Sequence, residues 1–221
     1  MRVILFGATG MIGQGVLREC LLDPGVIDVL SISRSATGQT HAKLRELLRA
    51  DLFDLTPIEP ELHGYDACFF CLGVSSVGMS EADYRRVTFD IAMAAAQTLV
   101  RLNPGMTFIF VSGAGSDAGG RSMWARVKGE TENALLRLPW KAVYVFRPAL
   151  VQPLHGIRSR TALYRALYLP LRPLIPLLVK LAPSFVTTTE QVGRAMLYAV
   201  RHGAPKRVLE SADINRCGPP A

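Results

Sequence analysis

Three glycines near the N-terminus have the spacing of a phosphate-binding turn. Gly7, Gly10 and Gly13 follow the apolar run of residues 3–6 and open a segment with helical apolar spacing. Gly7 allows a tight turn after a strand, Gly10 lets the backbone approach a pyrophosphate, and Gly13 lets the helix pack close to the sheet. The helix N-terminus offers free N–H groups and a positive dipole end to phosphates. We therefore predict a dinucleotide site whose first contact residues are Gly7, Thr9, Gly10, Met11, Ile12 and Gly13.

The residue after the second predicted strand, residues 27–33, bears on which dinucleotide fits. NAD-preferring folds place Asp or Glu about 20 residues beyond the glycine turn, where it holds the ribose hydroxyls. Here that place is Arg34, with Ser33 and Ser35 on either side. A guanidinium with flanking hydroxyls suits a 2′-phosphate, so we expect NADP in preference to NAD. The alternative is a solvated loop arginine, which leaves the preference open.

Strands and helices alternate along the chain, which favours an α/β fold with a doubly wound, Rossmann-type parallel sheet. The further predicted strands are residues 44–52, 67–72, 107–112 and 142–146. The predicted helices are residues 11–22, 80–102 and 123–138, and Ser80 is the expected N-cap of the second. We expect one NAD(P)-binding domain over residues 1–221, with residues 150–186 as a small helical cover over the substrate. The Gly/Pro-rich tail, residues 212–221, is expected to be loose.

Composition limits the class of protein. The 221 residues are 49% hydrophobic, which is enough for a sizeable core. No stretch of about 18 uncharged apolar residues predicts a membrane span. The glycine turn begins too early to leave room for a signal peptide, so the expected location is the cytoplasm.

The formal charge of +7 comes from one segment, residues 141–189. This segment has no acid, and outside it the 18 basic and 18 acidic residues balance. A basic segment can face an anionic ligand, a membrane surface or nucleic acid. Because it is interleaved with Leu, Tyr and Pro, we expect no nucleic acid partner. Its seven basic residues are Lys141, Arg147, Arg158, Arg160, Arg165, Arg172 and Lys180.

The spacing of Cys68 and Cys71 is that of a C-x-x-C metal or redox motif. The surrounding residues, however, predict a buried strand, on which residues three apart point to opposite faces. No second C-x-x-C and no nearby His pair completes a zinc site. We therefore interpret both as packed thiols and expect no metal.

Several of these motifs together resemble the short-chain dehydrogenase/reductase superfamily. More narrowly, they resemble its atypical, NmrA-like members, including the Tat-interacting-protein oxidoreductase group. The matching motifs are Gly7 to Gly13, Cys71-Leu72-Gly73, Val111-Ser112, Lys128-Gly129-Glu130, Phe146-Arg147-Pro148 and Thr187 to Gly193. The resemblance implies a Rossmann domain that binds NADP and acts as an oxidoreductase. It extends the expected cofactor contacts to Leu52, Cys71, Leu72, Gly73 and Lys128.

The catalytic motif departs from this resemblance. The superfamily uses Ser, Tyr and Lys, with the tyrosine four residues before the lysine. Lys128 matches the lysine and Ser112 the serine, but Trp124 occupies the tyrosine position. The resemblance implies that Ser112 orients a carbonyl and that Lys128 binds the nicotinamide ribose. An indole N–H only donates, so Trp124 cannot perform the usual proton transfer. Trp124 either stacks on the nicotinamide or a flat substrate, or packs beneath a loop.

Other residues can replace the missing acid. Tyr164 and Tyr168 lie four residues apart in the cover, and His155 follows the sixth strand. A lone loop histidine is more often exposed or hydrogen-bonded than catalytic. The cover itself, rich in Leu and basic residues, can act as a substrate lid, a membrane-contacting surface or a dimer contact.

Three functions therefore remain open. The first is an NADP-dependent oxidoreductase, or an isomerase or epimerase-like enzyme, on a small and hydrophobic substrate. The second is a non-catalytic NADP(H)-binding sensor or regulatory module, which Trp124 favours. The third is a peripheral membrane or lipid-handling protein. A homo-oligomer is compatible with each of them.

Overall fold

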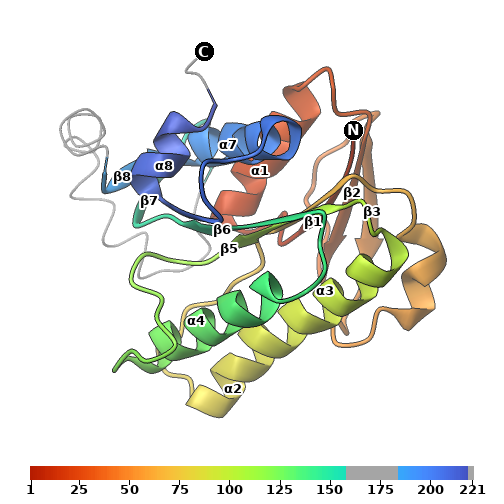
Figure 1. The fold of residues 1–221 in the computed structure, drawn as a ribbon. Helices are drawn as coiled ribbons and strands as arrows, with labels where there is room; N and C mark the ends of the chain where they lie inside the picture. Colours follow the sequence, from red (N-terminus) through yellow and green to blue (C-terminus); the bar gives the residue numbers. More distant parts are fainter. Residues whose placement is uncertain (158–183, 219–221) are drawn as a thin grey trace.

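The computed structural model describes residues 1–157 and 184–218. In this part, seven parallel strands form one sheet in the order β3-β2-β1-β4-β5-β6-β9 (Figure 1). Their bounds are β1 (Arg2–Phe6), β2 (Asp28–Ser33), β3 (Leu44–Leu48), β4 (Ala67–Phe70), β5 (Thr107–Val111), β6 (Ala142–Arg147) and β9 (Val208–Glu210). The predicted Rossmann-type parallel sheet is confirmed. The strand order reverses direction between β1 and β4, where folds of this kind bind their ligands.

Helices cover both faces of the sheet (Figure 1). One face carries α1 (Met11–Leu22), α7 (Thr189–His202) and α8 (Ser211–Arg216). The other carries α2 (Glu81–Arg85), α3 (Ile91–Leu102) and α4 (Met123–Leu136). Strand β1 supplies side chains to both layers, because Val3 and Leu5 face the first layer while Ile4 and Phe6 face the second. A strand buried on both faces is a continuous apolar run, as the sequence of residues 3–6 shows.

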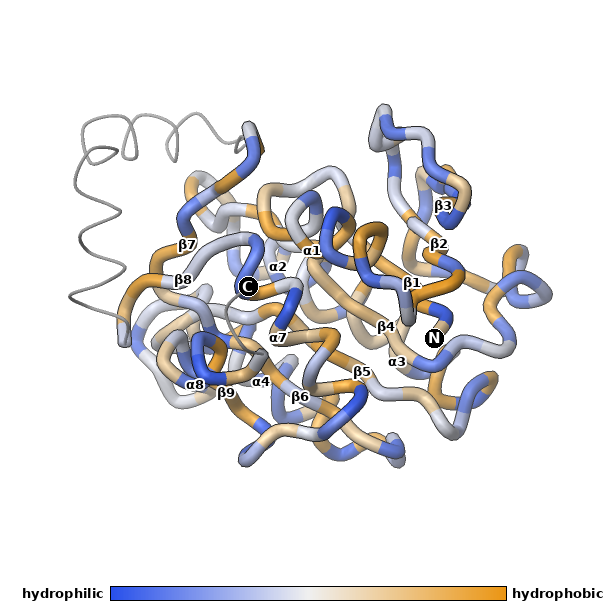
Figure 2. The backbone as a smooth tube through the Cα atoms, turned by 90° about the horizontal axis from the view of Figure 1, so that it is seen from above, coloured by the Kyte–Doolittle hydropathy of each residue, from blue (hydrophilic) through white to orange (hydrophobic). Residues whose placement is uncertain are grey.

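Hydrophobic residues concentrate along the central strands, and hydrophilic ones along the outer loops (Figure 2). Cys68 is fully buried in the cluster on the α3 side, and Cys71 packs against the opposite cluster. The prediction of two packed thiols on opposite faces is thus confirmed, and burial raises the pKa of both. Within the described residues, no group of three or more His, Cys, Asp and Glu side chains has the arrangement of a metal site.

Some elements differ from the expectation. The predicted helix 80–102 is three segments, because a π-helical turn, η2 (Arg86–Asp90), separates α2 from α3. Its predicted cap is confirmed, since Ser80 Oγ accepts a hydrogen bond from the Asp83 amide at 3.1 Å. The sequence did not indicate η1 (Thr56–Glu61), β9, or the parallel pair of β7 (Leu150–Gln152) and β8 (Val186–Thr188). Strand β3 is also shorter than predicted.

The expectation of a loose tail is wrong for residues 212–218. Residues up to Arg216 form α8, and Cys217 is buried. A reciprocal capping box joins Glu210 and Asp213 at the start of this helix, which local composition did not reveal. Most of the predicted cover, including its Tyr164, Tyr168 and five basic residues, lies outside the described residues. No helix in the described ranges is long and apolar enough to cross a membrane.

Helices α1 and α7 touch at glycines. A Cβ on Gly15 would lie 2.6 Å from the Cβ of Thr189, and a Cβ on Gly193 would lie 2.7 Å from Glu19 Cγ. The buried Glu19 accepts a hydrogen bond from Arg194 Nε at 3.2 Å. The helix that begins at the glycine turn is therefore held in place by a helix from the far end of the sequence.

Candidate functional site

The glycine turn has the geometry of a phosphate cradle. Gly7 has a φ of +80°, and its carbonyl accepts a hydrogen bond from the Gly10 amide at 3.0 Å. A Cβ on Gly13 would lie 2.0 Å from that same carbonyl oxygen, so only glycine fits there. Helix α1 starts after Gly10 with no side-chain cap and no acid in its first turn. Its positive end and free N–H groups are thus available to an anion, which fits a dinucleotide pyrophosphate.

A cavity of about 860 Å³ extends from this turn along the carboxyl edge of the sheet to α4. The volume suits a dinucleotide with room for a small molecule. Gly13 supports the turn from behind and does not line the cavity. The other predicted site residues all do so: Gly7, Thr9, Gly10, Met11, Ile12, Ser33, Arg34, Ser35, Leu52, Cys71, Leu72, Gly73, Ser112, Trp124 and Lys128.

The end of the cavity next to β2 carries the predicted 2′-phosphate residues. Arg34 is exposed and, within the described residues, has no hydrogen bond or ion pair. Ser33 Oγ donates to the Ser35 carbonyl at 2.7 Å, which shapes the loop that carries the guanidinium. An unpaired guanidinium at this place is free to bind an anionic ligand group.

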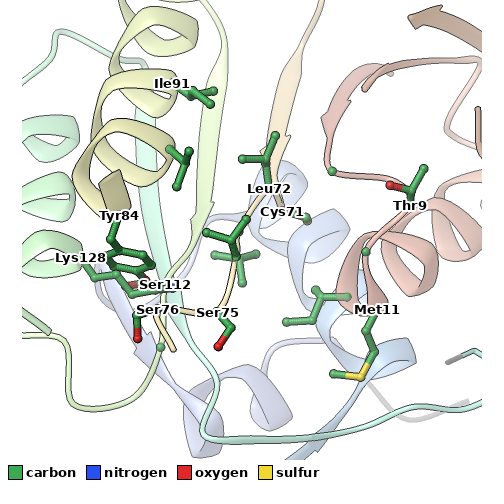
Figure 3. Close-up of a pocket in the computed structure, with 18 of the residues that line it drawn as sticks. Thr9, Met11, Cys71, Leu72, Ser75, Ser76, Tyr84, Ile91, Ser112 and Lys128 are labelled. Atoms are coloured by element: carbon green, nitrogen blue, oxygen red, sulfur yellow. The ribbon is translucent and has the colours of Figure 1, made fainter. Parts of the chain in front are cut away.

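The other end of the cavity carries Lys128 (Figure 3). Trp124, one turn earlier on α4, also lines the cavity. Within the described residues, no acceptor forms a hydrogen bond or ion pair with Lys128 Nζ, which lies 4.0 Å from where a Cβ on Gly113 would be. Burial lowers the pKa of Lys128 to about 8, and the carboxylate of Glu132 acts in the opposite direction. The ammonium form therefore predominates at neutral pH and can bind a ribose hydroxyl or a developing negative charge.

This burial makes a prediction about stability. The pKa of Lys128 is about 8 in the folded protein, against 10.5 for an ordinary lysine side chain in water. Folding is therefore penalised wherever both the folded and the unfolded chain carry the charge, below pH 8. Lys128→Met is expected to raise the free energy of unfolding by about 2 kcal/mol at pH 7. The gain should shrink as pH rises from 8 to 10.5, because the folded lysine is then neutral and the cost of removing its proton on folding falls as pH approaches the unfolded pKa.

Urea denaturation of wild type and variant at pH 7 and pH 10 measures this difference. Lys141→Met, at an exposed lysine, is the control. Its free energy of unfolding should differ little from that of wild type, and by the same amount at both pH values. If the free energy gained by Lys128→Met did not change between pH 7 and pH 10, burial of a charged Lys128 would not be what destabilises the folded protein.

Ser112 lines the cavity, but its hydroxyl is already hydrogen-bonded within the protein. Its hydroxyl lies 2.9 Å from Ser116 Oγ and donates to the buried carboxylate of Glu132. Arg147 Nε donates to both oxygens of Glu132 at 3.1 Å, and this contact is the main cause of the raised pKa of Arg147. The Glu132 carboxyl oxygens thus accept from both Arg147 and Ser112, and they take the one hydroxyl proton of Ser112. The carbonyl-orienting role implied for Ser112 stays a prediction, and it requires the hydroxyl to turn away from Glu132.

His155, an alternative acid, lies outside the cavity lining. It has a φ of +54°, and its Nε2 lies 2.5 Å from Glu190 Oε2. The hydrogen bond to His155 is the main cause of the lowered pKa of Glu190. His155 is therefore tied to the first turn of α7 and is not placed for proton transfer in the cavity.

Sequence reasoning missed Tyr84. Its side chain is 2% exposed and lines the cavity from α2. One tyrosine on a helix with apolar spacing is typical of a core residue, so no local signal identified it. Figure 3 shows Tyr84, Lys128, Ser112 and Ser76 at one end of the pocket, away from Thr9 and Met11.

Comparison with known proteins places this fold and site in a family. The family model of the NAD dependent epimerase/dehydratase family matches residues 3–119, just over half of the chain. The chain belongs to this family. Membership agrees with the predicted nicotinamide dinucleotide site and with the broader resemblance to short-chain dehydrogenases/reductases.

Two solved structures have the same fold as this chain. WbmF of Bordetella bronchiseptica, solved in complex with NAD+, has a TM-score of 0.69 at 15% identity, over 97% of this chain and 76% of that one. UDP-N-acetylglucosamine 4-epimerase of Methanobrevibacter ruminantium M1 has a TM-score of 0.66 at 16% identity, over 94% and 74%. These likenesses confirm the fold.

Curated relatives correct the expected location of this family member. Protein FMP52-1, mitochondrial, of Scheffersomyces stipitis is 24% identical over 153 residues, 68% of this chain and 67% of the relative. Protein fmp52, mitochondrial, of Emericella nidulans is 27% identical over 165 residues, 67% and 66%. The chain thus matches about two thirds of the length of each. Both relatives are named as mitochondrial, so the expectation of a cytoplasmic location is wrong on this comparison.

Proposed function

We propose that this chain is an NADP(H)-dependent oxidoreductase, or a related isomerase or epimerase-like enzyme, of the atypical, NmrA-like type. The observation that carries the proposal is one continuous cavity that joins the glycine turn to Arg34 at one end and Lys128 at the other. The glycine turn and Arg34 would bind the phosphates of a dinucleotide, and Lys128 would stand beside its reactive ring.

The residues of the cavity have distinct proposed roles. The N–H groups at the start of α1 hold the pyrophosphate, Arg34 holds the 2′-phosphate, and Lys128 binds the nicotinamide ribose. A bound reduced nicotinamide supplies a hydride to the substrate. Leu72 and Ile12 line the cavity and pack against the clusters on opposite faces of the sheet, and they keep water from the cofactor between its two ends.

The substrate is proposed to be small and mainly apolar. Between β4 and α4 the cavity is lined mostly by aliphatic and aromatic side chains, together with Ser75, Ser76 and Ser112. Its charged lining residues in the described ranges are Arg34 and Lys128 alone. The aliphatic and aromatic residues at this end are Val74, Tyr84, Val87, Ile91, Trp124 and Val151. A flat or aliphatic carbonyl compound fits such a wall better than a charged one.

Arg34→Ala tests the cofactor preference. Removal of the guanidinium is expected to weaken NADPH binding by a factor on the order of 10 to 100, because one charge-assisted contact to the 2′-phosphate is lost. NADH binding should change less than about twofold, since NADH has no such phosphate. Titration of nucleotide fluorescence measures both affinities, with Arg137→Ala, an exposed arginine at the end of α4, as control. Equal losses for the two nucleotides would contradict the assignment.

Trp124 favours a second candidate, an NADP(H)-binding module without turnover. The indole sits where the superfamily has its proton donor, and it also lines the cavity. A screen of aldehydes, ketones and quinones with NADPH separates the two candidates. Turnover of any of these compounds supports the enzyme, whereas tight NADPH binding with no turnover supports the module.

A further inference from the structure

We propose that Tyr84 is the proton donor of this site and replaces the tyrosine that is absent at position 124. The inference rests on the proposed oxidoreductase function. Tyr84 is nearly fully buried and borders the same cavity as Lys128 and Trp124. A phenol can release and regain a proton, whereas the indole of Trp124 is a donor that does not titrate.

Two ion pairs join α2 to α4. Glu81 lies 2.6 Å from Arg126, and Arg85 pairs with Glu130. Tyr84 lies between Glu81 and Arg85 on the short helix α2, so these two pairs, the clamp, flank the residue whose ring borders the cavity. The partners on α4 are one turn apart, as a pair of side chains on one helix face must be.

The residues of α4 that pair with α2 and those that line the cavity lie on adjacent faces of this helix. Arg126 and Glu130 hold α2, while Trp124 and Lys128, each two residues earlier, line the cavity. Tyr84 from α2 and Lys128 from α4 therefore line the same end of the pocket (Figure 3). The proton donor and the lysine come from two helices here, in place of two successive turns of one helix.

The proposed reaction is the reduction of a ketone by a reduced nicotinamide. The carbonyl carbon accepts the hydride, with two electrons, while the Tyr84 Oη–H bond breaks and an O–H bond forms on the carbonyl oxygen. The substrate becomes an alcohol, the nicotinamide is oxidised, and Tyr84 is left as tyrosinate. The ammonium of Lys128 stabilises this anion, which then takes a proton from water.

Three variants test whether the phenol is needed and where it must stand: Tyr84→Phe, Trp124→Tyr, and the two together. Reduction of acetophenone and other flat ketones by NADPH is measured, and NADPH affinity is followed by nucleotide fluorescence. Tyr84→Phe is expected to lower kcat by roughly 10² to 10⁴ with the same NADPH affinity. The double variant should regain at least about tenfold over Tyr84→Phe, because a phenol is restored at the superfamily position. Tyr198→Phe, outside the cavity and in tilted ring contact with His202, is the control and should behave as wild type.

Two further measurements separate proton donation from a structural role. In the complex with oxidised NADP and acetophenone, the carbonyl stretching frequency should be lowered in wild type and should rise in Tyr84→Phe, because the hydrogen bond is lost. Tyr84→3-fluorotyrosine keeps the ring and its hydroxyl, so it folds even where phenylalanine does not. Its more acidic phenol should move the pH profile of kcat to lower pH.

The outcomes are distinct. Wild-type kcat and an unchanged carbonyl frequency in Tyr84→Phe overturn the inference, as does a 3-fluorotyrosine variant with an unshifted pH profile. If wild type binds NADPH but binds and reduces no ketone, the proposed function fails and the inference fails with it. If wild type reduces ketones and Tyr84→Phe does so equally well, the inference alone fails.

Discussion

Gly13→Ala is expected to weaken dinucleotide binding about a hundredfold, or ~2.7 kcal/mol. The new Cβ would lie 2.0 Å from the Gly7 carbonyl oxygen, 2.7 Å from the Gly7 carbonyl carbon and 3.0 Å from Ala8 Cα. All three are backbone atoms, so no side-chain rotation relieves the clash. Helix α1 must move away from the turn, and its free N–H groups then leave the positions that phosphate oxygens require.

Titration with NADPH measures this loss, and thermal unfolding reports the accompanying strain, about 1–3 kcal/mol for an overpacked site. Gly105→Ala is the matched control, because its Cβ would meet no atom within 4 Å and its φ is not positive. The control should bind NADPH as wild type does. NADPH binding of wild-type strength by Gly13→Ala would show that the turn is not the phosphate cradle.

Glu132→Ala is expected to destabilise the protein by about 3 kcal/mol, the low end of the cost of breaking a buried ion pair. Its carboxylate is 2% exposed and receives hydrogen bonds from Arg147 and Ser112. Without it, the guanidinium keeps, among the residues that the structure describes, only the weaker ion pair with Glu210 at 3.5 Å. A half-buried charge that loses its main partner keeps the desolvation cost without the compensating attraction.

Urea denaturation of wild type and variant measures this loss. Glu130→Ala is the matched control on the same helix, because Glu130 is 38% exposed and pairs with Arg85 at the surface. A surface pair of this kind contributes less than about 1 kcal/mol. Equal losses for the two variants would mean that the pair of Glu132 and Arg147 is not a buried pair in solution.

The parts that the sequence predicted well are those with local causes. The glycine turn depends on three residues within seven positions and on the apolar strand before them. Trp124 and Lys128 share a helix face because they are four residues apart, which periodicity alone predicts. The parallel sheet followed from apolar runs of strand length alternating with amphipathic helices.

The parts that were missed depend on contacts between distant segments. Tyr84 becomes a cavity residue because α2 packs against α4, and the ion pairs between these two helices span 45 positions. The engagement of Ser112 by Glu132 likewise needs β5 and α4 to meet. Strands β7, β8 and β9 have three residues each, too short for periodicity to reveal. The tail was misjudged because its Gly and Pro content masked a helix held by long-range packing.

The contact between α1 and α7 sets an order of events during synthesis. Glu19 and Arg194 are 175 positions apart, so a ribosome completes the glycine turn long before it makes the helix that holds α1. Until then, the side of α1 that carries Gly15 stays open to water, and the turn can form but is not braced. Closing so distant a contact is slow compared with forming a helix. Tight dinucleotide binding is therefore expected among the last properties that the growing chain acquires.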